Sequence, residues 1–140
     1  MPNARYFKML STYVQVTEHP KGGDAGAEDL ELVYDALREG RCYISVDAIA
    51  PGRGFRYWAE SGDETALMGE ECPSGRWTLR AELPGRARIT LMHNGVAIGE
   101  AEGTSLEAEV SDAGAYRIEA HRHWRKRERP WIYSNPIYLR

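Results

Sequence analysis

The alternation of hydrophobic and polar residues changes its period at Gly40. Between residues 28 and 39, apolar side chains recur at the i, i+3, i+4 and i+7 positions of a helix, namely Leu30, Val33, Tyr34 and Leu37. Gly40 follows this stretch and is a typical residue for ending a helix. We therefore predict one short amphipathic helix over residues 28–39, followed by a region of a different kind.

After Gly40 the period drops to two, which predicts half-buried strands. The Asn94-Gly95 pair lies between two such runs and predicts a tight hairpin, because both turn positions favour a positive φ. Short strands separated by Gly, Pro and Asn predict an all-β fold, an immunoglobulin-like antiparallel β-sandwich preceded by the helix. The side chains expected to face its core are Trp77, Leu79, Ala81, Leu83, Ala87, Ile89, Leu91, Leu106, Ala108, Val110, Tyr116, Ile118 and Ala120.

The segment Asp112-Ala113-Gly114-Ala115-Tyr116 has the pattern of a tyrosine corner. In this motif a turn precedes a strand whose first Tyr hydroxyl bonds back to the backbone a few residues upstream. We expect Tyr116 to make that bond and Gly114 to have a positive φ.

Two aromatic residues, Tyr43 and Trp58, are expected to point outward from the first two strands after Gly40. One face of a sheet that meets water should be mainly polar, so we expect the helix, and in a longer protein another domain, to cover these side chains. Tyr43 and Trp58 are therefore the candidate interdomain surface. The alternative is that they are isolated exposed aromatics, which are common and need no special explanation.

Length, charge and composition suit a single soluble domain. The chain has 140 residues, 42% of them hydrophobic, and a net charge of −3. This balance argues against nucleic-acid binding, for which a strongly basic domain is typical. No apolar run reaches the ~20 residues that a membrane helix needs, so we expect no membrane partner and a cytoplasmic location. Cys42 and Cys72 are too few for a disulfide scaffold, and the sequence leaves open whether they pair.

Four segments carry a resemblance to a known family: WIYSNPIYLR at 131–140, DALREGRCYISVD at 35–47, GFRY at 54–57 and MGEE at 68–71. They resemble the C-terminal region of bacterial PHP-domain proteins, the polymerase and histidinol phosphatase family of metal-dependent phosphoesterases. The resemblance implies that residues 1–40 are the end of a preceding catalytic domain and that residues 41–140 are an immunoglobulin-like accessory domain. The parent protein would be a hydrolase that uses divalent metals.

The His and Asp motifs that bind metal in that family do not occur in this sequence. We therefore expect no catalysis and no cofactor in this fragment. The implied function is a non-catalytic accessory domain that docks on its own catalytic PHP domain and shapes the substrate entry. The alternative is an independent carbohydrate- or anion-binding module attached to an enzyme.

The candidate residues for ligand contact lie in one basic run near the C-terminus. Basic side chains next to an aromatic ring can hold a phosphate or nucleotide by charge-assisted hydrogen bonds and stacking. A solvated hairpin tip is the alternative explanation for such a run. His121 and His123 share one strand face nearby, but two imidazoles are fewer than the three or four ligands of a metal site. The candidate ligand residues are Arg122, Trp124, Arg125, Lys126 and Arg127.

Overall fold

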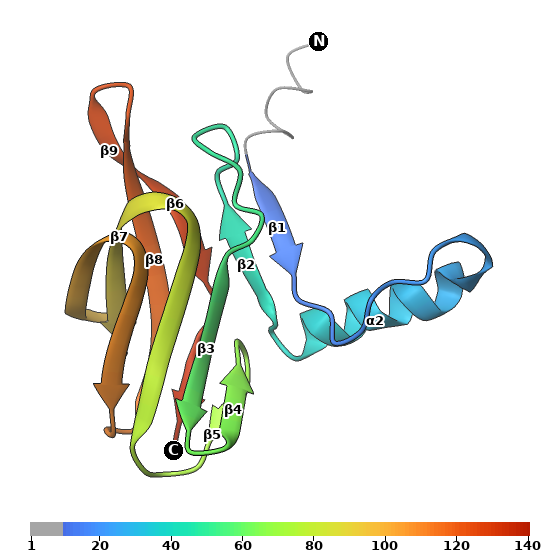
Figure 1. The fold of residues 1–140 in the computed structure, drawn as a ribbon, viewed down its shortest axis with the longest axis horizontal. Helices are drawn as coiled ribbons and strands as arrows, with labels where there is room; N and C mark the ends of the chain where they lie inside the picture. Colours follow the sequence, from blue (N-terminus) through green and yellow to red (C-terminus); the bar gives the residue numbers. More distant parts are fainter. Residues whose placement is uncertain (1–9) are drawn as a thin grey trace.

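The computed structural model describes residues 10–140, which form β-strands and one short helix (Figure 1). The predicted all-β fold with one short helix is confirmed. In chain order, the elements are β1 (Ser11–Val14), the 3-10 turn η1 (Gly23–Ala25), α2 (Gly26–Arg38), β2 (Cys42–Ser45), β3 (Arg56–Ser61), β4 (Glu64–Leu67), β5 (Glu71–Cys72), β6 (Trp77–His93), β7 (Val96–Val110), β8 (Gly114–Trp124), β9 (Arg127–Ser134) and β10 (Ile137–Leu139).

The strands belong to one curled, mainly antiparallel sheet. Its main path runs β1-β2-β9-β8-β6-β3-β4, while β7 pairs with β6, and β10 pairs with β8 and, in parallel, with β5. We expected two separate sheets, but hydrogen bonding is continuous from one part to the other. The sheet includes β1, so it begins in the segment before residue 40.

The hydrogen bonding is continuous because strand β6 is long and changes its partner strand along its length. Its first half pairs with β3, and its second half pairs with β8. The register against β7 breaks between Glu82 and Ala87, where residues 83–86 lie opposite Thr104 alone. Such an irregularity bends a strand, so the sheet turns back on itself. The hydroxyl of Tyr57 on β3 donates a 2.8 Å hydrogen bond across the core to the Tyr116 carbonyl on β8.

The core lies between the two parts of the curled sheet, and the predicted alternation on β6, β7 and β8 is confirmed. Leu79, Ile89, Leu91 and Ile118 are almost fully buried. The Asn94-Gly95 turn is also confirmed, with φ values of 50° and 82°, and it pairs His93 with Val96. The local pattern was sufficient here because each of these strands has one face in the core.

The tyrosine corner is confirmed. The Tyr116 hydroxyl donates a 2.6 Å hydrogen bond to the Asp112 carbonyl, and the ring itself is buried. Gly114 has a φ of 142°, a conformation that side-chain-bearing residues rarely adopt. The corner fixes the path of the chain where β7 passes to β8.

The orientation expected for β2 is wrong. Tyr43 is only 6% exposed and faces the core, while Ile44 is 46% exposed. The ring of Tyr43 stacks on Tyr13 of β1 at 5.0 Å, and its hydroxyl donates to the Gly52 carbonyl. The side chain is thus covered by a neighbouring strand, whose pairing with β2 the local sequence does not reveal.

Helix α2 confirms the predicted helix but does not cover the sheet as expected. It projects beyond the edge formed by β1 and β2 (Figure 1). Its main contacts with other elements are with η1 and β1, because β1 occupies the position next to β2 that the helix was expected to fill. Within residues 10–140, no helix is long and apolar enough to cross a membrane.

Truncating Leu91 to Ala should remove about 2–5 kcal/mol of unfolding free energy, because the side chain is fully enclosed in the core. Ile98→Ala is the matched control, since Ile98 is an exposed aliphatic residue on β7. Urea denaturation of both variants measures the difference. Equal losses would show that Leu91 does not fill the core.

Removing the corner oxygen by Tyr116→Phe should cost roughly 1 kcal/mol, the net contribution of one neutral hydrogen bond. Tyr138→Phe removes the same oxygen from an exposed ring on β10 and should leave stability unchanged. Thermal unfolding of the two variants makes the comparison. An unchanged midpoint for Tyr116→Phe would mean that the Asp112 bond adds nothing.

Candidate functional site

A hollow rich in arginine lies on β6, β7, β8 and β9, beside the bend of β6. Its volume is about 260 Å³. The residues that line it, which we call the basic hollow, are Arg86, Ala87, Arg88, Glu102, His121, Arg122, His123 and Glu128. Three guanidinium groups and two imidazoles thus face two carboxylates.

The guanidinium of Arg122 is held in place without an acidic partner. Its Cζ lies 4.9 Å from the centre of the Trp131 ring, a cation–π contact. On another side it packs against Gly85, where an added Cβ would come within 2.8 Å of the Arg122 Nη1. A residue with a side chain at position 85 would therefore displace this guanidinium. The bend of β6 and the ring of Trp131 together orient Arg122.

Two of the three arginines are available for a ligand. Within residues 10–140, no side-chain hydrogen bond or ion pair involves Arg86 or Arg122. Arg88 is different, because it pairs with both Glu128 and Glu100. These carboxylates raise the pKa of Arg88, whose hydrogen bond in turn lowers the pKa of Glu128. Arg88 therefore forms a neutralised wall of the hollow.

His121 has an unused polar atom beside these arginines. Its Nδ1 is buried without a hydrogen-bond partner, while its Nε2 lies 3.3 Å from the Tyr133 hydroxyl. A buried polar atom without a partner costs free energy, so it favours a ligand or water that can bond to it. His123 is exposed at the rim.

The predicted ligand residues separate into two groups. Arg122 lies in the basic hollow, whereas Arg125, Lys126 and Arg127 lie at or beside the tip of the β8–β9 hairpin. The guanidinium of Arg125 stacks on the Trp124 ring at 4.4 Å. The run is therefore in part the hairpin tip that the alternative explanation described.

Arg86 and Arg88 were missed by the sequence analysis. Both alternate with apolar residues on β6 and so have the pattern of an ordinary solvent-facing strand side. The register that brings Arg88 opposite His121 is a property of the β6–β8 pairing. No local signal marks that pairing, nor does one show that Arg86, in the bend of β6, lines the same hollow as Arg122.

Tyr43 and Trp58 do not share a surface. Tyr43 is in the core, and β2 and β3 are not paired in the sheet. The Trp58 ring is half-buried on β3, with its Nε1 donating to Glu60 and the Arg56 guanidinium 4.7 Å above it. Trp58 and Trp124 also line different depressions, so they do not form one aromatic platform for a sugar ring.

A second depression is apolar and lies between the β2–β3 loop and the hairpin. Its volume is about 200 Å³, and we call it the apolar groove. The loop is fixed to β9 by two bonds, from Val46 N to the Trp131 carbonyl and from Trp131 Nε1 to the Ala50 carbonyl. The groove is lined by Val46, Ala48, Ile49, Trp124, Arg129 and Pro130.

The described residues provide few groups for catalysis. In the range 10–140, no three His, Cys, Asp or Glu side chains gather in an arrangement that could hold a metal ion. Cys42 and Cys72 are both free thiols, and burial raises the pKa of Cys72 to about 11. A thiol with so high a pKa is a poor nucleophile at neutral pH.

Comparison with known proteins gave no match: no family model, no curated protein and no solved structure matches this chain. The resemblance to PHP-domain proteins therefore stays a prediction from the sequence.

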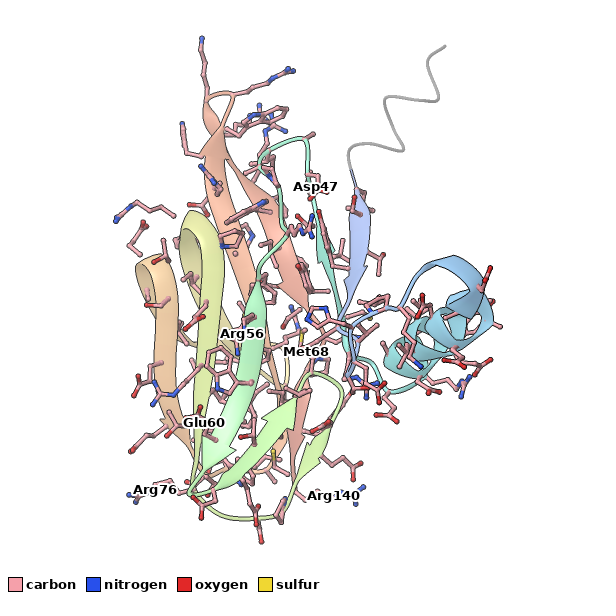
Figure 2. All side chains as sticks on the ribbon, turned by 45° about the vertical axis from the view of Figure 1, so that its right-hand side comes forward. Asp47, Arg56, Glu60, Met68, Arg76 and Arg140 are labelled. Carbon is pink, nitrogen blue, oxygen red and sulfur yellow. The ribbon has the colours of Figure 1, made fainter. Side chains whose placement is uncertain are left out.

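Asp47 fixes the start of the β2–β3 loop to β1 (Figure 2). It accepts hydrogen bonds from the Tyr13 hydroxyl at 2.7 Å, the Ser45 hydroxyl at 2.8 Å and the Gly52 N–H at 3.1 Å. Burial by itself would raise the pKa of this carboxyl, but these bonds favour the charged form and hold the pKa below its ordinary value. Asp47 therefore stabilises the loop as a carboxylate.

The pKa of Asp47 is lower in the folded chain than in the unfolded chain. The contribution of Asp47 to the free energy of unfolding should therefore be complete above the unfolded pKa of about 4, and it should disappear as the pH falls through the pKa of the folded chain. Asp47→Asn should lower the free energy of unfolding by about 1 kcal/mol at pH 7, and by progressively less as the pH is lowered. Urea denaturation from pH 7 to pH 3 measures this, with the exposed Asp63→Asn as control. A penalty that is independent of pH would contradict the charged network.

Proposed function

We propose that this chain is a non-catalytic binding domain that holds an anionic group, of the phosphate type, in the basic hollow. The observation that carries the proposal is the guanidinium of Arg122, which is fixed on Trp131 and has no acidic partner among the described residues. A planar guanidinium matches the oxygens of a phosphate or carboxylate in a bidentate way.

Arg86 supports the proposal because it adds a second unpaired guanidinium at the same hollow. His121 also lines the hollow and has an imidazole, a group that can donate or accept a hydrogen bond. Of the two carboxylates in the hollow, Glu128 is neutralised by Arg88, so only Glu102 would repel an anion. A small anion with several acceptor oxygens suits this set of groups best.

The role implied by the PHP resemblance is a second candidate. In that role the chain is an accessory domain that docks on its own catalytic domain, and a hollow for phosphate-type anions would suit a phosphoesterase. Both descriptions treat the chain as non-catalytic. The anion-binding proposal rests mainly on Arg122 and does not require the resemblance.

The direct test titrates inorganic phosphate into ¹⁵N-labelled protein and follows the amide signals by NMR. We expect saturable shifts at Gly85, Arg86 and residues 121–123. Replacing a guanidinium that makes a charge-assisted bond removes about 1.5–3 kcal/mol, so Arg122→Gln should weaken binding by about ten- to a hundredfold. Arg76→Gln, an exposed arginine distant from the hollow, should have no effect.

Gly85→Ala tests whether the guanidinium must be held in position. It leaves every charge in place but brings a Cβ against Arg122, so phosphate affinity should fall while the chain stays folded. Shifts that do not saturate, or an Arg122→Gln variant that binds as well as the wild type, would contradict the proposal. Inorganic sulfate in a parallel titration distinguishes a phosphate-selective site from a general anion site.

A further inference from the structure

Helix α2 exposes an apolar stripe along the part of its surface that faces away from the sheet. Leu30, Tyr34 and Leu37 are 50%, 47% and 46% exposed. They lie at i, i+4 and i+7 and so form one continuous side of the helix. About half of each of these side chains stays exposed within residues 10–140, and an exposed apolar stripe of this kind is typical of a helix that docks in a groove.

The same helix is acidic. Of the charged residues in α2, only Arg38 is basic, and it pairs with Asp35 and Glu31. The acids of the helix are Glu28, which pairs with Lys21, and Asp29, Glu31 and Asp35. A partner for the stripe should therefore be apolar in its centre and positively charged around it.

The chain itself has such a surface at another place. The apolar groove provides the apolar centre, and Arg129 is part of its wall. The hairpin tip next to it adds positive charge, and no ion pair among the described residues neutralises Arg125, Lys126 or Arg127. Figure 1 shows the tip of the β8–β9 hairpin and α2 well apart, so one copy does not close the contact on itself.

The hairpin tip has basic residues at turn positions whose backbone conformation favours Asn or Gly. Arg125 and Lys126 have φ values of 50° and 65°, a region that costs residues with a Cβ roughly 1 kcal/mol each. The chain uses Asn94-Gly95, a sequence suited to this geometry, for the β6–β7 turn. Two basic residues therefore occupy a turn where Asn and Gly would be less strained.

We propose that α2 of one copy docks into the apolar groove of a second copy, with the acids of the helix against the basic hairpin tip. Leu30, Tyr34 and Leu37 supply the apolar contact, and the opposite charges set the orientation. The two surfaces differ, so the contact is head-to-tail: in a pair, one copy keeps a free groove and the other keeps a free helix. Such a contact builds open chains or closed rings of copies.

Sedimentation velocity between about 1 μM and about 1 mM tests the contact, since this range covers weak and moderate Kd values. We expect the sedimentation coefficient to increase with concentration and to decrease again when salt screens the charges. Leu37→Lys should leave the chain monomeric, as should the double variant Arg125→Glu/Lys126→Glu. All three positions are exposed, so the unfolding midpoint should not change.

Matched controls lie outside both surfaces. Leu10→Lys changes another exposed leucine, and Arg76→Glu reverses a charge at the end of the sheet away from the hairpin tip (Figure 2). Both should associate as the wild type does. The variants at 37, 125 and 126 lie outside the basic hollow and should bind phosphate normally, so this test and the phosphate titration fail independently.

Mixing the two monomeric variants is the decisive experiment. Leu37→Lys keeps an intact groove and tip, and Arg125→Glu/Lys126→Glu keeps an intact helix. The mixture should therefore form complexes that contain one copy of each variant, and no larger assemblies. A mixture that stays monomeric overturns the head-to-tail contact. Loss of association in Leu37→Lys but not in the double variant also overturns it, because that result indicates helix-to-helix pairing. A wild-type chain that stays monomeric at every concentration overturns it too, and leaves the stripe to a different protein.

Discussion

The structure depends on the bend of β6 between Glu82 and Ala87. One strand pairs with β3 before the bend and with β8 after it, so the two parts of the sheet face each other while their hydrogen bonding remains continuous. This arrangement encloses the core and lets the Tyr57 hydroxyl reach the Tyr116 carbonyl across it. A straight β6 would leave one face of the sheet open to water.

The same bend builds the basic hollow. Gly85 lies within it, and the absence of a side chain there leaves room for the Arg122 guanidinium on the ring of Trp131. Arg86 follows immediately and faces the same space. The element that closes the core thus also orients the positive charges of the candidate site, so the stability of the bend and the geometry of the hollow are linked.

Charge is distributed unevenly over the molecule. Helix α2 is acidic and exposes apolar side chains, whereas the β8–β9 hairpin tip and the hollow beside β6 are basic. A net charge of −3 conceals this separation. Net charge bears on non-specific binding and solubility, but the position of the charges decides which surfaces attract each other.

Local pattern was enough for the elements whose form depends on near neighbours. The period of two placed Leu91 and Ile118 in the core, Asn94-Gly95 set its turn through φ, and Tyr116 reached an acceptor only four residues upstream. Each of these features is determined within a few residues, because pleat, turn and corner geometry are properties of short segments.

Features that join distant segments were decided by the tertiary structure alone. The sequence of β2 does not show that Tyr43 would be covered by Tyr13 of β1, so the face was assigned wrongly. Nor does it show that Arg86 and Arg122, on strands separated by the whole of β7, would meet in one hollow. The physical reason is that strand pairing and register depend on which faces bury the most apolar surface together, a comparison over the whole chain that no single segment contains.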